Sequence, residues 1–373
     1  MTSLKDVRSM GSERAESFIQ NVSGKNCFFV CVISYTETCE IPGITVAGAD
    51  PELIKYTPAA DAEFLYHGEC RCIETVPATP DGKPTPALIT RAALKSAEIP
   101  LVVVDAGSKV KPDLPYFSLG LEHHGGNIAD GRALDTPLVR KAFEKGVELG
   151  STLARAMKHI VIGESIPAGT TTALGVLLAM GIDAKYRVSS SMPRNPHELK
   201  LATVERGMKA AGLGFGSLAG KPFEAVSCLG DPMIPSVAGI AVGASTGNSN
   251  VMLAGGTQMA VVLSFIDAIN RGALEKMVVG TTRYIVDDQT SDILQLISSA
   301  SSSIPIPLLS CDPHLERSGK EGLRAYADGF VKDGVGAGGA CTAAMLKSRG
   351  AIDGDALLGR IESEYESVIW RPV

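Results

Sequence analysis

The sequence contains few aromatic residues and no strong excess of charge of either sign. Aromatic residues make up 5% of the 373 positions, with a single Trp, and the formal net charge is −6. No block of Lys and Arg residues occurs, so neither nucleic acid nor an acidic membrane surface is expected as a partner. With 45% hydrophobic and 20% charged residues, the composition is typical of a globular protein.

Long hydrophobic runs are also missing. The longest apolar stretches, such as residues 173–182, are too short to cross a bilayer. Residues 1–17 are polar and lack the apolar core of a secretory signal. We therefore expect a cytoplasmic protein without membrane contact.

The pattern of Cys and His residues predicts no metal site. The eight cysteines include one Cys-x-Cys, Cys70–Cys72, without a second pair at zinc-binding spacing, and buried free cysteine is common. Adjacent residues of a strand point to opposite faces, so His123 and His124 do not form one ligand set. We expect neither a metal nor a cofactor.

Glycine is abundant and concentrated in two segments. The first, Asp333–Ala340, places an acid before a run too rich in glycine for a packed helix or strand. Glycine lacks a Cβ, so backbone amides there can approach a ligand closely, and the acid could accept a proton. A flexible turn with a solvated aspartate is the alternative interpretation.

The second segment, Gly163–Thr172, joins an apolar strand to a helix. The unpaired N–H groups at a helix N-terminus favour an anion, so Gly169, Thr170, Thr171 and Thr172 are candidate phosphate ligands. The P-loop lysine is missing, which favours a mononucleotide or sugar phosphate over ATP hydrolysis. Alternatively, the threonines cap a buried helix.

Three apolar strands, each followed by a small-residue turn, predict the fold. Residues 100–107, 160–164 and 250–256 lack polar alternation, which is typical of parallel strands buried on both faces. Helical patterns over 138–158 and 198–211 fit β-α-β units. We expect an α/β fold with a doubly wound, mostly parallel sheet and helices on both faces, with ligands at the carboxyl ends of the strands.

The chain ends predict a second, smaller unit. Residues 4–19 and 355–369 have helical patterns, and the serine run at 298–303 is expected to be a linker or exposed loop. The expected domains are a large α/β ligand-binding domain at 26–300 and a small, mostly helical lobe. That lobe would consist of 1–25 and 301–373 and carry the Asp333 loop.

Several motifs occur in an order known from one family. Residues 163–173 resemble its Gly-Glu-x-Gly-x-Gly-Asn-Thr-Thr-Ala loop, and Lys200–Glu205 resembles its Lys-Ile-Ala-Val-Val-Glu. Residues 236–256 resemble its Ala-Gly-x-x-x-Gly-Ala helix and following strand, with Ala254 in place of an aspartate. Asp333–Ala337 resembles its Glu-Gly-x-Gly-Ala. These motifs, together with residues 42–63, resemble the nicotinate-nucleotide–dimethylbenzimidazole phosphoribosyltransferase family, in its archaeal and cyanobacterial branch.

The resemblance implies transfer of 5-phosphoribose from nicotinate mononucleotide to a benzimidazole-like base. The product would be an α-ribazole phosphate for the lower ligand of a cobamide, and the enzyme would be a homodimer. Asp333, which is one methylene shorter than the family's glutamate, would be the general base. Glu164 would lie near the ribose or nicotinate, and the phosphate on Gly169–Thr172 and Lys200. Further contacts are expected from Gly255, Gly256, Gly334 and Gly336.

Two alternatives remain open. The protein could be a related glycosyltransferase that uses another acceptor, such as adenine or a phenol. It could also be a non-catalytic nucleotide-binding protein on the same fold, because fold alone does not determine function.

Overall fold

An eight-stranded sheet runs through the molecule in the computed structural model, which describes residues 4–48 and 50–369. The strand order is β1-β8-β7-β6-β5-β2-β3-β4. β1 pairs with β8 in antiparallel fashion, and all the other pairs are parallel. The strands are β1 (Val7–Met10), β2 (Phe28–Ile33), β3 (Leu101–Asp105), β4 (Phe117–Ser118), β5 (His159–Ser165), β6 (Asn250–Ala254), β7 (Met277–Thr282) and β8 (Leu308–Cys311). The predicted mostly parallel α/β sheet is confirmed.

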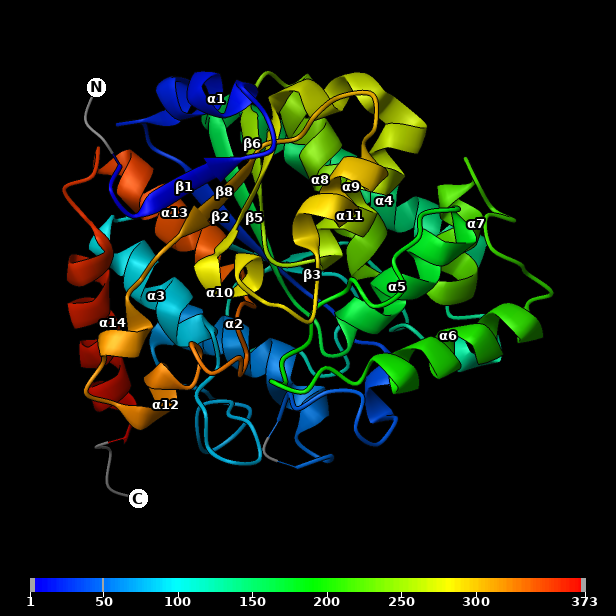
Figure 1. Cartoon of the computed structure of the whole chain (residues 1–373), viewed down its shortest axis with the longest axis horizontal. Coiled ribbons are helices and arrows are strands. Elements are labelled where there is room, and N and C mark those ends of the chain that lie inside the picture. The colour runs from blue at the N-terminus through cyan, green and yellow to red at the C-terminus, as the bar shows by residue number, and fades with distance from the viewer. Residues whose placement is uncertain (1–3, 49, 370–373) are drawn as a thin grey trace.

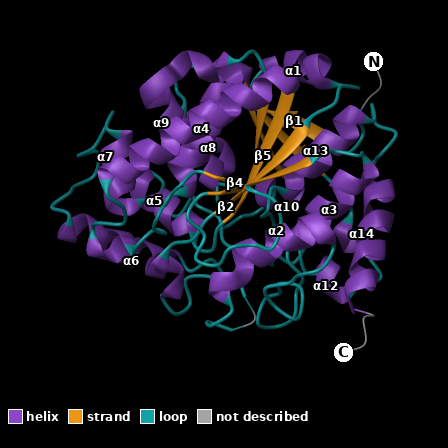
Figure 2. Cartoon of the chain, turned by 180° about the vertical axis from the view of Figure 1, so that it is seen from behind, coloured by secondary structure: helices purple, strands orange, loops and turns teal. Residues whose placement is uncertain are grey.

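Helices cover both faces of this sheet, as Figure 1 shows and Figure 2 repeats from behind. One layer holds α4 (Thr136–Ala156), α5 (Gly169–Ala179), α6 (His197–Ala210), α7 (Pro222–Leu229), α8 (Met233–Thr246), α9 (Gln258–Asn270) and α11 (Ile293–Ala300). The other holds α1 (Arg14–Val22), α2 (Thr57–His67), α3 (Ala87–Ser96), α12 (Glu321–Arg324), α13 (Ala337–Lys347) and α14 (Gly354–Ile369). The short α10 (Arg283–Val286) follows β7.

The two helical layers explain why the strands read as continuous apolar runs. In β2, Val30 and Val32 pack into the core under α8, whereas Phe29 and Cys31 pack into the core under α2. Successive side chains of a strand point to opposite faces, and here both faces are covered. The sequence therefore shows no polar alternation in this strand.

Two local predictions near the chain ends are wrong. Residues 4–19 do not form one helix, because Val7–Met10 pair with β8 at the sheet edge before α1 begins at Arg14. Part of the serine run, Ser298–Ala300, ends the helix α11, whose apolar side packs on α9. The predicted helix near the C-terminus, α14, is present.

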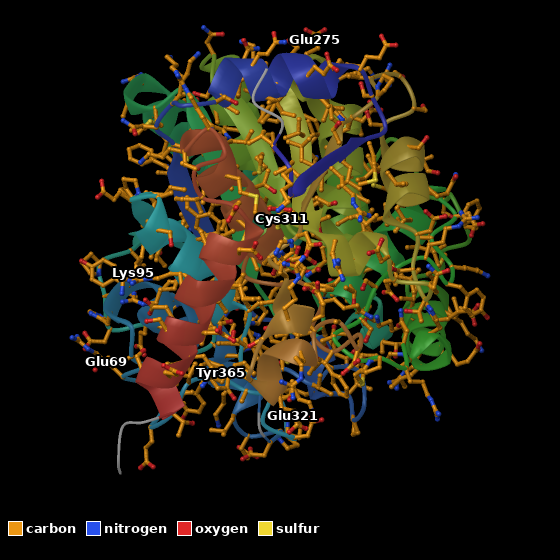
Figure 3. All side chains as sticks on the ribbon, turned by 60° about the vertical axis from the view of Figure 1, so that its left-hand side comes forward. Glu69, Lys95, Glu275, Cys311, Glu321 and Tyr365 are labelled. Carbon is orange, nitrogen blue, oxygen red and sulfur yellow. The ribbon has the colours of Figure 1, made fainter. Side chains whose placement is uncertain are left out.

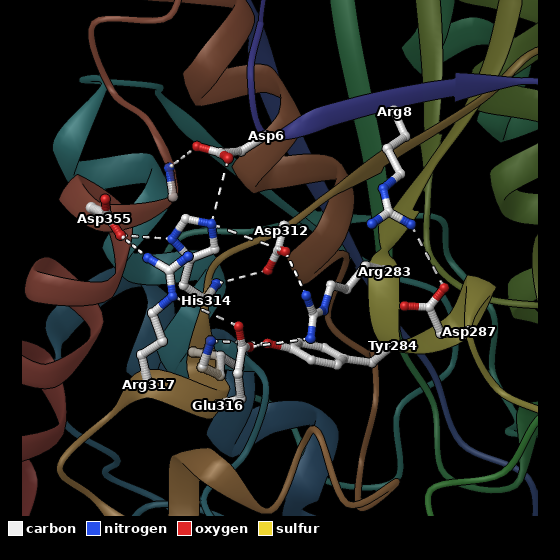
Figure 4. Close-up of polar contacts among 12 residues, drawn as sticks. Asp6, Arg8, Arg283, Tyr284, Asp287, Asp312, His314, Glu316, Arg317 and Asp355 are labelled. Atoms are coloured by element: carbon white, nitrogen blue, oxygen red, sulfur yellow. Dashed lines mark hydrogen bonds and ion pairs between the residues drawn. The ribbon is translucent and has the colours of Figure 1, made fainter.

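Both terminal segments contribute strands to the same sheet, β1 from 1–25 and β8 from 301–373. The division into a large domain at 26–300 and a terminal lobe stays a prediction. Figure 4 shows His314 where the two segments meet. Its Nδ1 lies 2.7 Å from Asp355 Oδ1 and its Nε2 lies 3.4 Å from Asp6 Oδ1.

Helix α14 lies along α3 on one side of the molecule, where Figure 3 labels Lys95 and Tyr365. Glu364 of α14 is buried and pairs with Arg91 at 3.1 Å and Lys95 at 2.8 Å. Of the helices described, none is long and apolar enough to span a membrane.

Candidate active site

The strand order reverses between β2 and β5, and a ligand cavity lies at the carboxyl end of β5. The chain moves outward from β2 through β3 to β4, then returns to the other side of β2 with β5. Such a reversal leaves a crevice at the carboxyl ends of the two central strands, where open α/β sheets bind ligands. The cavity at the end of β5 is lined by Ile44–Gly48, Thr57, Asp61, Pro77–Thr79, Lys83–Pro86, Glu164–Thr170, Ser189–Ser191, Gly256–Gln258, Ile285, Val331 and Asp333–Val335. Both glycine-rich segments singled out in the sequence therefore reach one cavity.

The turn after β5 brings part of the predicted phosphate loop to the cavity. Gly169 and Thr170 line it, directly after Ala168, which has the left-handed φ of 64°. Thr171 and Thr172 are instead buried. Thr172 Oγ1 donates to Asp231 Oδ2 at 2.5 Å, and it also contacts Gly169 O at 2.9 Å. Thr172 therefore holds the start of α5 in place, whereas the buried Thr171 Oγ1 has no hydrogen-bond partner among the described residues. Phosphate binding by the two threonines stays a prediction.

Asp333 sits at the end of a strained segment. Val331 and Lys332 both have φ of 59°, and Val335 has φ of 51°. Left-handed backbone costs about 1–2 kcal/mol for an L-residue, and β-branched residues rarely adopt it. Such conformations persist where the surrounding structure fixes them, and they cluster at functional sites.

The carboxylate of Asp333 accepts four hydrogen bonds. Oδ1 accepts from the N–H groups of Gly334 at 2.7 Å and Gly338 at 3.3 Å. Oδ2 accepts from Thr281 Oγ1 at 2.8 Å and from Thr282 N at 3.0 Å. Burial raises the pKa of Asp333, while these four bonds favour its ionised form. The flexible, solvated turn considered from the sequence is therefore wrong.

The glycines after Asp333 are partly helical, which corrects the prediction that this run cannot pack as a helix. α13 begins at Ala337, and its glycines let it lie directly on the sheet. A Cβ on Gly336 would lie 2.9 Å from Gly163 Cα and 3.1 Å from the Ala254 side chain. The small side chain of Ala254 matches this close approach.

Glu164 lies at the end of β5 and lines the cavity, although only 3% of its surface is exposed. Its Oε1 accepts a hydrogen bond of 3.2 Å from Gln258 Nε2. Burial raises the pKa of Glu164 well above its usual value, and the nearby carboxylates Asp231, Asp333 and Asp61 raise it further. Burial and these neighbouring charges therefore favour the protonated form of Glu164.

Two further carboxylates complete this acidic group and were missed in the sequence. Asp61 of α2 accepts hydrogen bonds from Thr85 Oγ1 at 2.6 Å and Ser165 Oγ at 2.7 Å. Burial raises the pKa of Asp61 to about 6, and it does the same for Asp231 before α8. Neither acid has a sequence signal of its own, because their proximity arises from the packing of α2 and α8 against β5.

Several predicted site residues lie behind the cavity wall. Lys200 is buried and its Nζ donates to Ser189 O at 2.6 Å. Burial and the neighbouring Lys332 lower the pKa of Lys200 to about 7. Gly256 and Gly334 line the cavity, whereas Gly255 lies against Met259 and Gly336 against the sheet. The roles given to all these residues stay predictions.

The serine turn Ser189–Ser191 also lines the cavity and was not singled out in the sequence. It lies in the connection between α5 and α6 and carries no motif, so its place at the cavity became visible in three dimensions alone. Gly243–Gly247 matches the Gly-x-Ser-x-Gly pattern of serine hydrolases, but it ends α8. Ser245 there is buried and donates to Ala273 O at 2.6 Å, so it is no exposed nucleophile.

The Cys and His residues form no metal-binding group within the described part of the chain. The eight cysteines are free thiols. His124 packs edge-on against Tyr35 with ring centroids 5.3 Å apart.

The comparisons with known proteins agree with this geometry. A family model described as a phosphoribosyltransferase matches residues 88–283. The UPF0284 protein of Methanothermobacter thermautotrophicus is 45% identical over 334 residues, covering 88% of this chain and 90% of the relative. That of Archaeoglobus fulgidus is 48% identical over 341 residues, covering 91% and 94%.

A solved structure shares the fold. The nicotinate-nucleotide–dimethylbenzimidazole phosphoribosyltransferase of Thermus thermophilus superposes with a TM-score of 0.55 at 15% identity, covering 92% of each chain. The chain therefore belongs to the nicotinate-nucleotide–dimethylbenzimidazole phosphoribosyltransferase family, and it is a phosphoribosyltransferase, an enzyme that transfers a pentosyl group.

Proposed function

We propose that the protein transfers 5-phosphoribose from nicotinate mononucleotide to a benzimidazole-like base. The observation that carries this proposal is the presence of two carboxyl groups with different surroundings, Asp333 and Glu164, in one cavity. Acid and base roles at neutral pH are separated by environments that push two pKa values apart. Four donors favour the ionised form of Asp333 and oppose the effect of its burial, whereas burial and three neighbouring acids favour the protonated form of Glu164.

In the proposed reaction, a nitrogen lone pair of the azole attacks C1′ of the ribose. The bond between C1′ and the pyridinium nitrogen breaks, its electron pair moves to the ring, and nicotinate leaves. The N–H proton of the azole passes to Asp333. The longest hydrogen bond of this carboxylate, 3.3 Å from Gly338 N to Oδ1, is the one that a bond from the azole would most easily replace. Glu164 donates a hydrogen bond to nicotinate mononucleotide, and the surrounding acids favour the positive charge that develops on the ribose.

The donor phosphate would lie where backbone amides and hydroxyls meet, at Gly169–Thr170, Ser189–Ser191 and Gly256–Gln258. The start of α5 contributes its unpaired N–H groups. Lys200 lies behind the serine turn, where its Nζ donates to the carbonyl of Ser189. Its positive charge would therefore act on the phosphate at short range without direct contact.

Incubation of the protein with nicotinate mononucleotide and a panel of bases tests the proposal. The panel contains dimethylbenzimidazole, adenine and a phenol, and the readouts are free nicotinate and the mass of the ribosylated base. We expect nicotinate release that depends on a benzimidazole. Release with adenine or the phenol alone would favour the related glycosyltransferase, and donor binding without release would favour a non-catalytic protein.

A further inference from the structure

Two buried lysines lie near a single aspartate behind the serine turn. Lys332 and Lys200 each have 1% of their surface exposed. Lys332 Nζ lies 3.0 Å from Asp288 Oδ2 and 3.3 Å from Met192 O. Lys200 is close enough to both Lys332 and Asp288 for their charges to act on its pKa in opposite directions. The cluster therefore contains two lysines and one carboxylate.

This imbalance has an energetic consequence. A buried charge is stable when it is paired and hydrogen-bonded. Asp288 is already occupied by Lys332 and by hydroxyl donors from Ser189, Thr290 and Ser291. Lys200 has a carbonyl for its partner, so an anion in the adjoining serine turn would supply the missing negative charge.

Lys332 belongs to the strained segment that precedes Asp333. Val331 N donates to Ser191 O at 2.8 Å, so this segment is bonded directly to the serine turn. Lys332 O accepts from Thr282 Oγ1 at 2.6 Å. The Lys332 ammonium thus lies on the side of the serine turn, while the adjacent Asp333 carboxylate lines the cavity.

We propose that Lys332 is a positioning residue, whose buried ammonium ties the serine turn that receives the donor's anionic group to the left-handed segment that holds Asp333. The inference rests on the proposed function. If so, the position of the serine turn and the position of the Asp333 carboxylate depend on each other. Loss of Lys332 releases the backbone at 331–333 and lets Asp333 leave its position.

A double-mutant cycle on kcat tests this coupling. In the wild type, Lys332→Met should lower kcat at least about 10-fold, and Lys332→Arg should restore much of it. In an Asp333→Asn background, Lys332→Met should change kcat less than about 2-fold, because the group it positions is already disabled. Equal losses in both backgrounds would overturn the proposal. Lys145→Met, at an exposed ion pair, is the control and should leave kcat unchanged.

Hydrogen exchange provides a readout that does not depend on turnover. Lys332→Met should accelerate amide exchange at both 331–335 and 189–192, and unchanged protection at either would overturn the coupling. If Lys332→Met does not fold, Lys332→Met combined with Asp288→Asn removes both charges and serves in its place. A wild type that releases no nicotinate refutes the proposed function, and the exchange pattern then decides the structural coupling by itself.

Discussion

At the scale of single residues, the site depends on two acids whose environments differ. Asp333 accepts four hydrogen bonds and Glu164 accepts one from a side chain, Gln258. Hydrogen bonds to the charged form favour ionisation, whereas burial near other carboxylates opposes it. This difference assigns the proton acceptor to Asp333 and hydrogen-bond donation to Glu164.

Asp333→Asn should lower kcat about 10²–10⁴-fold, because the amide cannot take a proton. Affinity for nicotinate mononucleotide, measured by calorimetry, should change little, since the phosphate contacts lie elsewhere. Near wild-type turnover with unchanged donor affinity would contradict the assignment.

Glu164→Gln provides the matched comparison. The variant imitates the protonated carboxyl group, so we expect kcat within about 10-fold of the wild type in the same assay. A loss as large as that of Asp333→Asn would instead indicate that Glu164 is the proton acceptor.

At the scale of elements, the site depends on how closely α13 lies on the sheet. Gly338 stands against the backbone of Thr281, where a Cβ would overlap main-chain atoms of β7. The same residue donates its N–H to Asp333. Packing of the helix and placement of the acid therefore both depend on Gly338.

Gly338→Ala should lower the free energy of unfolding by at least about 1–3 kcal/mol, because the backbone must move apart. Gly359→Ala in α14 is the control, since a Cβ there meets nothing within 4 Å. Alanine in that exposed helical position should be neutral or stabilising by up to about 1 kcal/mol. Denaturant unfolding of both variants measures the difference, and equal stabilities would contradict the packing argument.

At the scale of the whole molecule, the buried acids make stability depend on pH. Asp61 has a pKa of about 6 in the folded protein, raised by burial from an ordinary value near 4. Between these values the folded state binds more protons than the unfolded state, so this group's contribution to stability falls as pH rises. At about 1.4 kcal/mol per pKa unit, the loss amounts to about 3 kcal/mol by pH 7.

Asp61→Asn should remove that dependence. Relative to the variant, the wild type should lose unfolding free energy between pH 4 and pH 7, as measured by denaturant unfolding at each pH. The exposed Asp183→Asn is the control and should run parallel to the wild type. A constant difference in unfolding free energy between wild type and Asp61→Asn across this range would show that burial does not raise the pKa of Asp61.

We also propose a homodimer, which the family resemblance suggests. Light scattering at micromolar concentration should give twice the 38.9 kDa chain mass. A monomer at that concentration would contradict the proposal.

The sequence alone determined the parallel sheet and the edge that carries the ligand. Apolar strands without alternation, such as residues 250–254, identify a sheet covered on both faces, and the turn after each strand marks its carboxyl end. Local patterns determine these features, so they are visible one segment at a time. The sequence also placed Asp333 and Glu164 as the candidate acids.

Tertiary structure decided which residues share the cavity and in which charge state. Asp61 and Ser189–Ser191 are far from Asp333 in the sequence and line the same cavity. Asp231 lies close enough to Glu164 for its charge to raise the pKa of that carboxyl group. Glycines predicted to prevent helix formation instead let α13 lie against β7. Burial and the sum of neighbouring charges set a pKa, and both are properties of the folded chain rather than of any segment.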